Sequence, residues 1–417
     1  MNREAGITRR AFIWNTVSGM INAGQSALIL IFISHFLTHT DAGMFTIAFA
    51  LANLFSTMGR YGVRNYQVTD VQENSRFGEY LRARLYTVTG AMAIMLAYLA
   101  FQAAKGIYSV EKISVLFVIC VWKMIDAVED VYYGMYQQRG RLDIGAKCYS
   151  VRLMLSTAVM CALLMCRVSL LVASILATVI SIALAVAFVR LTIGQFQASG
   201  EAVRGEAVRH ILRVCLPLFV GTTLSIFVGN SPKYMIDWYM DEGTQAIFGY
   251  IMMPAFVIMV LNQFIYQPII RGLGELWQSG NRPRFVRRVM LQYLVVFAVT
   301  LLVIAGGYFA GIPLLSLLYN IDLAPYKTEF ILLLLGGGIY ALVNFIMVPL
   351  TAMRFQNCIP FGFAGAAVLS VALGSVFVPS RGIFGAACLY LAINLMLAIY
   401  LSGCFFYRAM RSDSARR

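Results

Sequence analysis

Long apolar stretches separated by short polar segments run through almost the whole chain, from Ala11 to Phe406. A helix needs about 20 mostly apolar residues to cross a hydrocarbon layer of roughly 30 Å. The pattern predicts twelve membrane-spanning helices, at approximately residues 11–37, 42–59, 85–104, 113–135, 148–166, 168–190, 214–238, 244–270, 289–310, 328–349, 359–378 and 383–406. We therefore expect an all-α integral membrane protein.

Basic residues are distributed unevenly over the segments between these spans. If both termini are cytoplasmic, the inside segments carry 25 of the 33 Lys and Arg residues and the outside segments carry five. Because Lys and Arg concentrate in cytoplasmic loops, this distribution predicts cytoplasmic termini. The same loops lie next to anionic lipid headgroups and account for the formal net charge of +14. No nucleic-acid partner is indicated, since the chain has no recognisable binding module.

Composition and motifs argue against an enzyme. Hydrophobic residues make up 60% of the chain and charged residues 12%. The sequence has no HExxH, GxSxG or P-loop pattern, and no space for a nucleotide-binding domain. Its eight cysteines lie in or beside apolar stretches without metal-ligand spacing. We expect no cofactor, no metal and no disulfide.

The longest polar interval between spans, Gln195–Arg213, separates six spans from six. It predicts an N-terminal six-helix bundle at residues 1–200 and a C-terminal six-helix bundle at residues 201–417. The spans that follow Asp41 and Asp241 support a duplication, because each aspartate precedes a tyrosine, Tyr66 or Tyr266, by 25 residues. An even number of spans in each half predicts parallel repeats.

One helical face of span 42–59 is polar. Its residues and their continuation toward the cytoplasm are Asn53, Ser56, Thr57, Arg60 and Arg64. The two arginines have two interpretations: they bind a pyrophosphate at the cytoplasmic entrance, because a guanidinium matches phosphate oxygens, or they anchor the helix at the inner face. Anchoring is the favoured interpretation for Arg64, whereas both stay open for Arg60.

Span 113–135 carries Lys123, Asp126, Glu129 and Asp130. Ionisable residues at membrane depth cost at least about 2.5 to 3.5 kcal/mol each, so they face a cavity or pair with one another. In one interpretation Lys123 neutralises Asp126, and Arg152 of the next span neutralises Asp130. In the other, Lys123 lies in an anion pathway and Asp126 or Asp130 binds the H⁺ or Na⁺ that couples transport to an ion gradient.

Two further spans have polar faces that suit either sugar hydroxyls or hydrogen bonds between helices. In span 11–37 these residues are Asn15, Ser18, Asn22 and Gln25. In span 214–238 they are Thr222, Ser225, Asn230 and Lys233. Pro217 and Pro232 are able to break that span and to free carbonyls toward a cavity. Lys233 either lines a cavity or forms a salt bridge with Asp237.

The span order and four local segments resemble a known family. These segments are Arg9–Asn15, Asp41–Gly43, Gly62–Tyr66 and Gly134–Arg141. Together they resemble a Wzx-type polysaccharide flippase of the multidrug/oligosaccharidyl-lipid/polysaccharide (MOP) exporter superfamily. The resemblance implies two bundles that rock around a cationic cavity and move a polyprenyl-pyrophosphate-linked oligosaccharide across the cytoplasmic membrane. It also implies polysaccharide assembly proteins as candidate partners.

Two other functions fit parts of the pattern. A cation-coupled multidrug exporter of the same superfamily would favour a cavity of carboxylates and aromatic rings, and the basic residues of this chain argue against it. A membrane polysaccharide polymerase or ligase would need a larger external domain than the longest outside loop, Gly311–Lys327. The basic amphipathic segments 204–213 and 282–288 are expected to lie on the inner leaflet as helices or loops.

Overall fold

The computed structural model describes residues 2–70, 75–194, 203–266 and 269–414, and no strand occurs among them. The chain forms two compact units, Met1–Ile226 and Phe227–Arg417. The division lies within one helix, α8 (Gly205–Tyr239). The bundle boundary expected between residues 200 and 201 falls outside the described residues.

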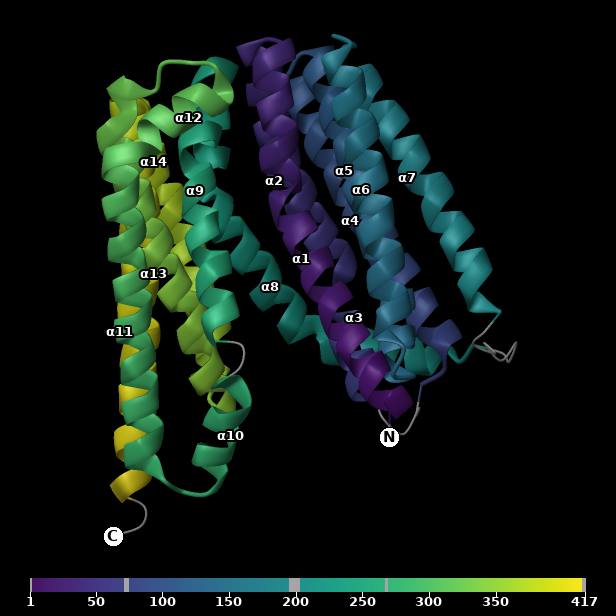
Figure 1. Cartoon of the computed structure of the whole chain (residues 1–417), viewed down its shortest axis with the longest axis vertical. Helices are drawn as coiled ribbons and strands as arrows, with labels where there is room; N and C mark the ends of the chain where they lie inside the picture. The colour runs from purple at the N-terminus through teal and green to yellow at the C-terminus, as the bar shows by residue number, and fades with distance from the viewer. Residues whose placement is uncertain (1, 71–74, 195–202, 267–268, 415–417) are drawn as a thin grey trace. The chain divides into compact units, whose positions relative to one another are not determined.

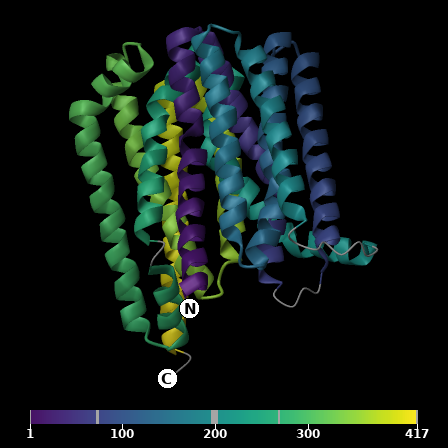
Figure 2. The ribbon, with the colours of Figure 1, turned by 45° about the vertical axis from the view of Figure 1, so that its right-hand side comes forward.

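The first unit contains six long helices that run alongside one another (Figures 1 and 2). They are α1 Asn2–Phe36, α2 His39–Arg60, α4 Phe77–Ala104, α5 Val110–Gln138, α6 Leu142–Met165 and α7 Leu170–Ile193, with the short α3 Val63–Thr69 after α2. Helix α5 packs against α2, α3, α4, α6 and α7. Its polar side chains therefore face protein, which is what charged residues in a membrane helix require.

The second unit contains α9 Glu242–Tyr266, α10 Ile270–Gln278, α11 Arg282–Gly306, α12 Ile312–Tyr319, α13 Lys327–Ala352 and α14 Cys358–Ser414. Helix α13 packs against α9, α11 and α14. The 57 residues of α14 are two helices joined at a kink, where Gly382 has φ 57° and ψ −132°. Only glycine adopts this conformation readily, so the kink depends on the missing side chain.

Nine helices in the described part of the chain are long and apolar enough to cross a membrane. Helix α5 is not among them, since its four central charges lower its hydropathy. Many large apolar side chains point outward, including Leu302, Phe309 and Leu317, which are 74%, 80% and 76% exposed. An apolar exterior of this kind suits lipid contact. The count of twelve spans and the cytoplasmic termini stay predictions.

The ends of α2 explain two of the sequence segments singled out above. At its start Thr38 and Asp41 form a capping box, in which the Asp41 N–H donates to Thr38 Oγ1 at 3.2 Å and the Thr38 N–H donates to Asp41 Oδ2 at 3.1 Å. At its end Tyr61 and Gly62 have φ of 51° and 71°, and the chain turns sharply into α3. A Cβ at Gly62 would lie 2.7 Å from Leu218 Cδ2, so this tight turn requires glycine.

Several helices extend further than the sequence pattern predicts. Segments 205–213 and 282–288 are the first turns of α8 and α11, continuous with the apolar helices that follow. Glu79, in the first turn of α4, is fully buried and accepts a hydrogen bond from Arg204 Nε at 2.7 Å. Arg204, just before α8, is thus paired with the first turn of α4.

Two further segments are more helical than the sequence pattern suggests. The expected outside loop 311–327 includes helix α12 and a further short turn, because a π-helical turn at Gly307–Gly311 lets the chain continue after α11 without a break. Helix α8 runs through Pro217 and Pro232. A proline removes only one backbone donor, and neighbouring turns hold such a helix together.

The predicted orientation can be tested by cysteine labelling in a background without the eight native cysteines. We expect Ser75→Cys, Gly205→Cys and Arg282→Cys to react with a membrane-impermeant maleimide only from the cytoplasmic side. Asn320→Cys, in the turn after α12, should react only from outside. Labelling of Gly205→Cys in intact cells would contradict the orientation.

Candidate functional site

Helix α5 distributes the three carboxylates of its C-terminal half, Asp126, Glu129 and Asp130, over adjoining faces. Successive residues of an α-helix are rotated by about 100°, so Glu129 and Asp130 lie on either side of the direction in which Asp126 points. Asp126, whose direction lies between those of Glu129 and Asp130, is 3% exposed. Different neighbouring helices therefore supply the cations that each carboxylate meets.

Asp126 is held by three cations from three helices. Its Oδ2 lies 2.7 Å from Lys123 Nζ, one turn earlier on α5, and 4.0 Å from Arg60 Nη2 of α2. Its Oδ1 accepts a hydrogen bond from Arg152 Nη2 of α6. The predicted pair of Lys123 and Asp126 is thus present.

The second predicted pair was wrong. Arg152 does not neutralise Asp130; besides Asp126 it contacts Glu129, with Nε 2.8 Å from Oε2, and donates to Ser181 Oγ of α7 at 2.6 Å. Its side chain is fully buried. Helical geometry explains this choice of partner. Glu129 is on the side of α5 that meets α6, whereas Asp130 is on the side that meets α3 and α4.

Asp130 instead pairs with arginines of α3 and α4. Arg84 Nη2 lies 2.7 Å from Asp130 Oδ2, and Arg64 Nη1 lies 3.4 Å from Oδ1. Arg84 is fully buried and also donates to the Gly59 carbonyl at 2.9 Å. Arg64 donates to Gln137 Oε1 at 2.7 Å, and its guanidinium lies 4.2 Å from the centre of the Tyr133 ring. Arg64 is thus more than a terminal anchor of its helix.

Amide side chains of α1 complete the surroundings of Lys123. Its Nζ donates to Asn22 Oδ1 at 3.2 Å and to Gln25 Oε1 at 3.3 Å. Gln25 in turn donates to Thr157 Oγ1 at 2.9 Å. Part of the predicted polar face of span 11–37 therefore meets the predicted lysine.

Two other predicted residues lie further from the charges. Asn15 is exposed, and its carbonyl accepts a hydrogen bond from Ser18 Oγ at 2.8 Å. Asn53 of α2 is half-buried. One turn later, Ser56 Oγ donates to the Lys123 carbonyl at 3.0 Å, which fixes α2 against α5.

We call the ion-paired set of α2 to α6 the charge cluster: Arg60, Arg64, Arg84, Lys123, Asp126, Glu129, Asp130 and Arg152. Its five cations and three carboxylates give a net formal charge of +2. The loosest ion pair is that of Arg60, which is 4.0 Å from Asp126 and whose side chain is 37% exposed. Excess positive charge at low dielectric attracts an anion, and Arg60 is placed to contact one.

The remaining predicted residues belong to the second unit. Lys233 is buried on α8, with its Nζ 5.2 Å from the centre of the Phe256 ring of α9. Asn230, one turn earlier, is half-buried. The salt bridge between Lys233 and Asp237 stays a prediction. Within the described ranges, no group of three or more His, Cys, Asp or Glu side chains could hold a metal ion.

Sequence reasoning missed Arg84 and the role of Tyr149. Arg84 lies at the edge of an apolar stretch, where a basic residue resembles an ordinary membrane anchor. Tyr149 donates to Asn22 Oδ1 at 3.3 Å, and nothing in its local sequence indicates a polar neighbour. Both depend on contacts between helices far apart in the chain.

Comparison with known proteins gives one family and one fold. Residues 8–270 match the family model described as "Polysaccharide biosynthesis protein". The structure is similar to an inward-facing multidrug resistance MATE family transporter of the MOP superfamily, with 15% identity, TM-score 0.67, and 97% of this chain and 99% of that chain covered. It is also similar to the lipid II flippase MurJ in an inward closed conformation, with 13% identity, TM-score 0.71 and coverages of 96% and 90%.

A third similar structure is a MOP superfamily transporter from Pyrococcus furiosus, with 15% identity, TM-score 0.64 and coverages of 99% and 97%. No curated protein matches the sequence significantly. At these identities the solved structures establish the fold alone, which this chain shares with the two transporters and the flippase named above.

Proposed function

Because the chain belongs to the polysaccharide biosynthesis protein family, we propose that it flips a polyprenyl-pyrophosphate-linked oligosaccharide across the cytoplasmic membrane by alternating access. The observation that carries this proposal is the charge cluster, with its net formal charge of +2 inside a membrane helix bundle. A buried excess of positive charge is costly to insert and suits an anionic substrate group such as a pyrophosphate.

In this proposal the cations bind the pyrophosphate. Arg60 contacts it directly, because it is the most exposed cation of the charge cluster with the longest ion-pair distance. Lys123 and Arg64 contribute charge next to it, and the substrate contact of Lys233 stays a prediction. Guanidinium groups suit this role because two of their N–H groups match two phosphate oxygens.

The neighbouring amides suit the sugar. Asn22 and Gln25 lie beside Lys123, so a substrate whose pyrophosphate reaches the cations would bring its first sugar close to them. The same role is assigned to two other residues of the first unit, Asn15 and Asn53, and the sugar contact of Asn230 stays a prediction. Amide groups both donate to and accept from hydroxyls, which fits a sugar surface.

Coupling to H⁺ or Na⁺ is part of the proposal. The coupling roles assigned to Asp126 and Asp130 stay predictions. Asp126 contacts three cations and Asp130 contacts two, so protonation of either would weaken several ion pairs at once. The same net positive charge repels a cationic drug, which argues against the multidrug alternative.

Flipping by the purified protein tests this function. Proteoliposomes with a fluorescent undecaprenyl-pyrophosphate-linked oligosaccharide in both leaflets should expose the inner-leaflet pool to an external glycosidase, and empty liposomes should not. In cells that lack the protein, lipid-linked sugar should accumulate in the inner leaflet. Cationic dye efflux without glycolipid movement would contradict the proposal and favour the drug exporter.

A further inference from the structure

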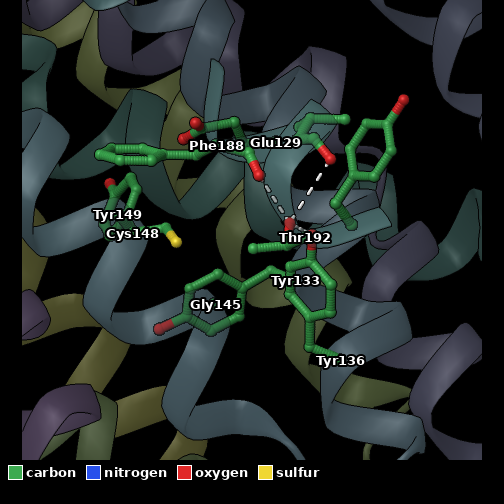
Figure 3. A pocket seen from close by; sticks show the side chains of 10 residues that line it. Glu129, Tyr133, Tyr136, Gly145, Cys148, Tyr149, Phe188 and Thr192 are labelled. Atoms are coloured by element: carbon green, nitrogen blue, oxygen red, sulfur yellow. Dashed lines mark hydrogen bonds between the residues drawn. The ribbon is translucent and has the colours of Figure 1, made fainter. Parts of the chain in front are cut away.

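A small, partly open cavity lies beside the charge cluster in the first unit, between α5, α6 and α7. Its volume is about 20 Å³. Glu129 lines it together with aromatic and small side chains (Figure 3). On the α7 side Tyr136 and Thr192 share a hydrogen bond of 2.5 Å, and the Thr192 hydroxyl also donates to the Phe188 carbonyl at 2.6 Å. Those hydroxyls therefore already have partners.

Glu129 differs from the other two carboxylates of the charge cluster. Among the described residues its ion pairing is limited to Arg152, and Arg152 is shared with Asp126. Asp126 meets three cations and Asp130 meets two. Loss of the Glu129 charge would leave Arg152 paired with Asp126 and bonded to Ser181. Glu129 is thus the carboxylate whose neutralisation disturbs the fewest contacts.

The size of the cavity decides what it can hold. A volume of about 20 Å³ accommodates one water molecule and excludes a sugar or a drug. A sodium ion would lie close to the Arg152 guanidinium, which is 2.8 Å from Glu129 Oε2, and would be repelled by it. A proton adds no volume and neutralises the carboxylate, so it fits both the space and the charge.

We propose that Glu129 is a proton-binding site whose occupancy is coupled to the binding of an anion by the charge cluster. Hydronium from bulk solvent transfers a proton to a carboxylate oxygen of Glu129; an O–H bond of hydronium breaks, an O–H bond of the carboxylic acid forms, and water is left. The transfer needs no other reactant.

The groups that face Glu129 come from three helices. Helix α5 contributes Asp126, Tyr132, Tyr133 and Tyr136; helix α6 contributes Cys148, Tyr149 and Arg152; helix α7 contributes Thr192. Among these groups, the charged partners of Glu129 are Arg152 and Asp126. Arg152 favours the carboxylate, whereas Asp126 and the aromatic surroundings favour the neutral acid.

The sign of the coupling follows from charge. Protonation of Glu129 removes one negative charge and raises the net formal charge of the charge cluster by one unit, so an anion binds more tightly at low pH. By reciprocity, anion binding raises the proton affinity of Glu129 by the same factor. One unit charge at roughly 10 Å, with an effective dielectric constant of about 20, corresponds to a change on the order of tenfold in affinity.

Infrared difference spectroscopy of the full-length protein in lipid tests the site without any transport. As pH falls from about 8 to about 5, the range available to buried carboxyl groups, wild type should gain a carboxylic-acid C=O band. That band should be absent in Glu129→Gln, shifted in Glu129→Asp and unchanged in Asp143→Asn. Asp143 is a suitable control because it pairs with Arg141 at 3.0 Å, outside the cavity.

The result overturns the proposal if the band persists in Glu129→Gln, or if wild type shows no band. The Glu129→Asp variant keeps a carboxyl group at this position. A shifted band in this variant assigns the band to residue 129 even if Glu129→Gln does not fold. Addition of sodium at constant pH should not remove the band, and its removal would identify a sodium site instead.

The coupling rests on the proposed function and is measured separately. Wild-type flipping at a substrate concentration below saturation should rise on the order of tenfold between about pH 8 and about pH 6. In Glu129→Gln the rate should be the same at both pH values. If wild type flips no lipid-linked oligosaccharide but the band belongs to Glu129, the proposed function fails and the proton site stands. Equal pH dependence in both proteins would overturn the coupling.

Discussion

Replacement of Arg152 by methionine is expected to lower the free energy of unfolding by about 3 to 5 kcal/mol, because it removes the partner of two buried carboxylates. Arg152 is fully buried and bonds to Asp126, Glu129 and Ser181. Asp126 would keep Lys123 at 2.7 Å, but Glu129 would keep no cation among the described residues. Thermal and chemical unfolding in detergent, followed by circular dichroism, measures the loss.

A second variant separates lost charge pairing from lost packing. In Arg152→Met with Glu129→Gln, the carboxylate left without a partner is removed, so at least half of the lost stability should return. The Arg141→Met variant is the control, since Arg141 is 40% exposed and paired with Asp143 at 3.0 Å. Such an exposed pair contributes about 0 to 1 kcal/mol. An Arg152→Met protein as stable as Arg141→Met would contradict this account.

Helical periodicity predicted the contacts that lie within one helix or on one regular face. Lys123 and Asp126 are three residues apart, and their ion pair was expected from that spacing. Asn22 and Gln25 share a face of α1 for the same reason, and both meet Lys123. The helical spans were also predicted well, because a membrane core imposes a minimum apolar length on each of them.

Contacts between helices could not be predicted in the same way. Arg152 was assigned to Asp130, and its real partners are Asp126 and Glu129. Helical geometry predicts that Glu129 and Asp130 lie about 100° apart around the axis of α5. It does not predict which of the two residues faces α6. Arg84 was counted as a membrane anchor, although it is fully buried against Asp130. A single amino-acid sequence carries no information about such pairings.

The pair of Arg204 and Glu79 illustrates a further limit. The two residues are 125 positions apart, and each lies in a basic or mixed polar segment that resembles an interfacial loop. Their contact stabilises the chain where α4 and α8 begin. The observed helices therefore begin earlier than the apolar stretches of the sequence predict. Boundaries based on apolar runs alone miss helical turns that are stabilised by buried charge.

Replacement of Arg60 by alanine is expected to lower the flipping rate by roughly 10- to 100-fold with little change in folding. A charge-assisted hydrogen bond to a phosphate contributes about 1.5 to 3 kcal/mol, and every 1.4 kcal/mol corresponds to about tenfold. Asp126 would keep Lys123 and Arg152, so no buried carboxylate loses all its partners. Arg60→Lys should retain part of the activity, because it keeps the charge but loses the planar fork.

The measurement is flipping in proteoliposomes at matched protein levels. Arg141→Ala is the matched control, because the Arg141 side chain is 40% exposed and that of Arg60 is 37% exposed, and each pairs with an aspartate. The control should flip at the wild-type rate. Equal rates for Arg60→Ala and Arg141→Ala would remove Arg60 from the anion pathway.

Lys123 requires a double variant, because its removal both lowers the positive charge and takes a partner from Asp126. Lys123→Ala should reduce flipping and expression, whereas Lys123→Arg should retain part of both. In Lys123→Ala with Asp126→Ala the net formal charge is restored, and Arg152 keeps Glu129 and Ser181. If Lys123 contacts the substrate, this double variant should be expressed and folded but still flip slowly. Wild-type flipping by the double variant would mean that Lys123 serves only to neutralise Asp126.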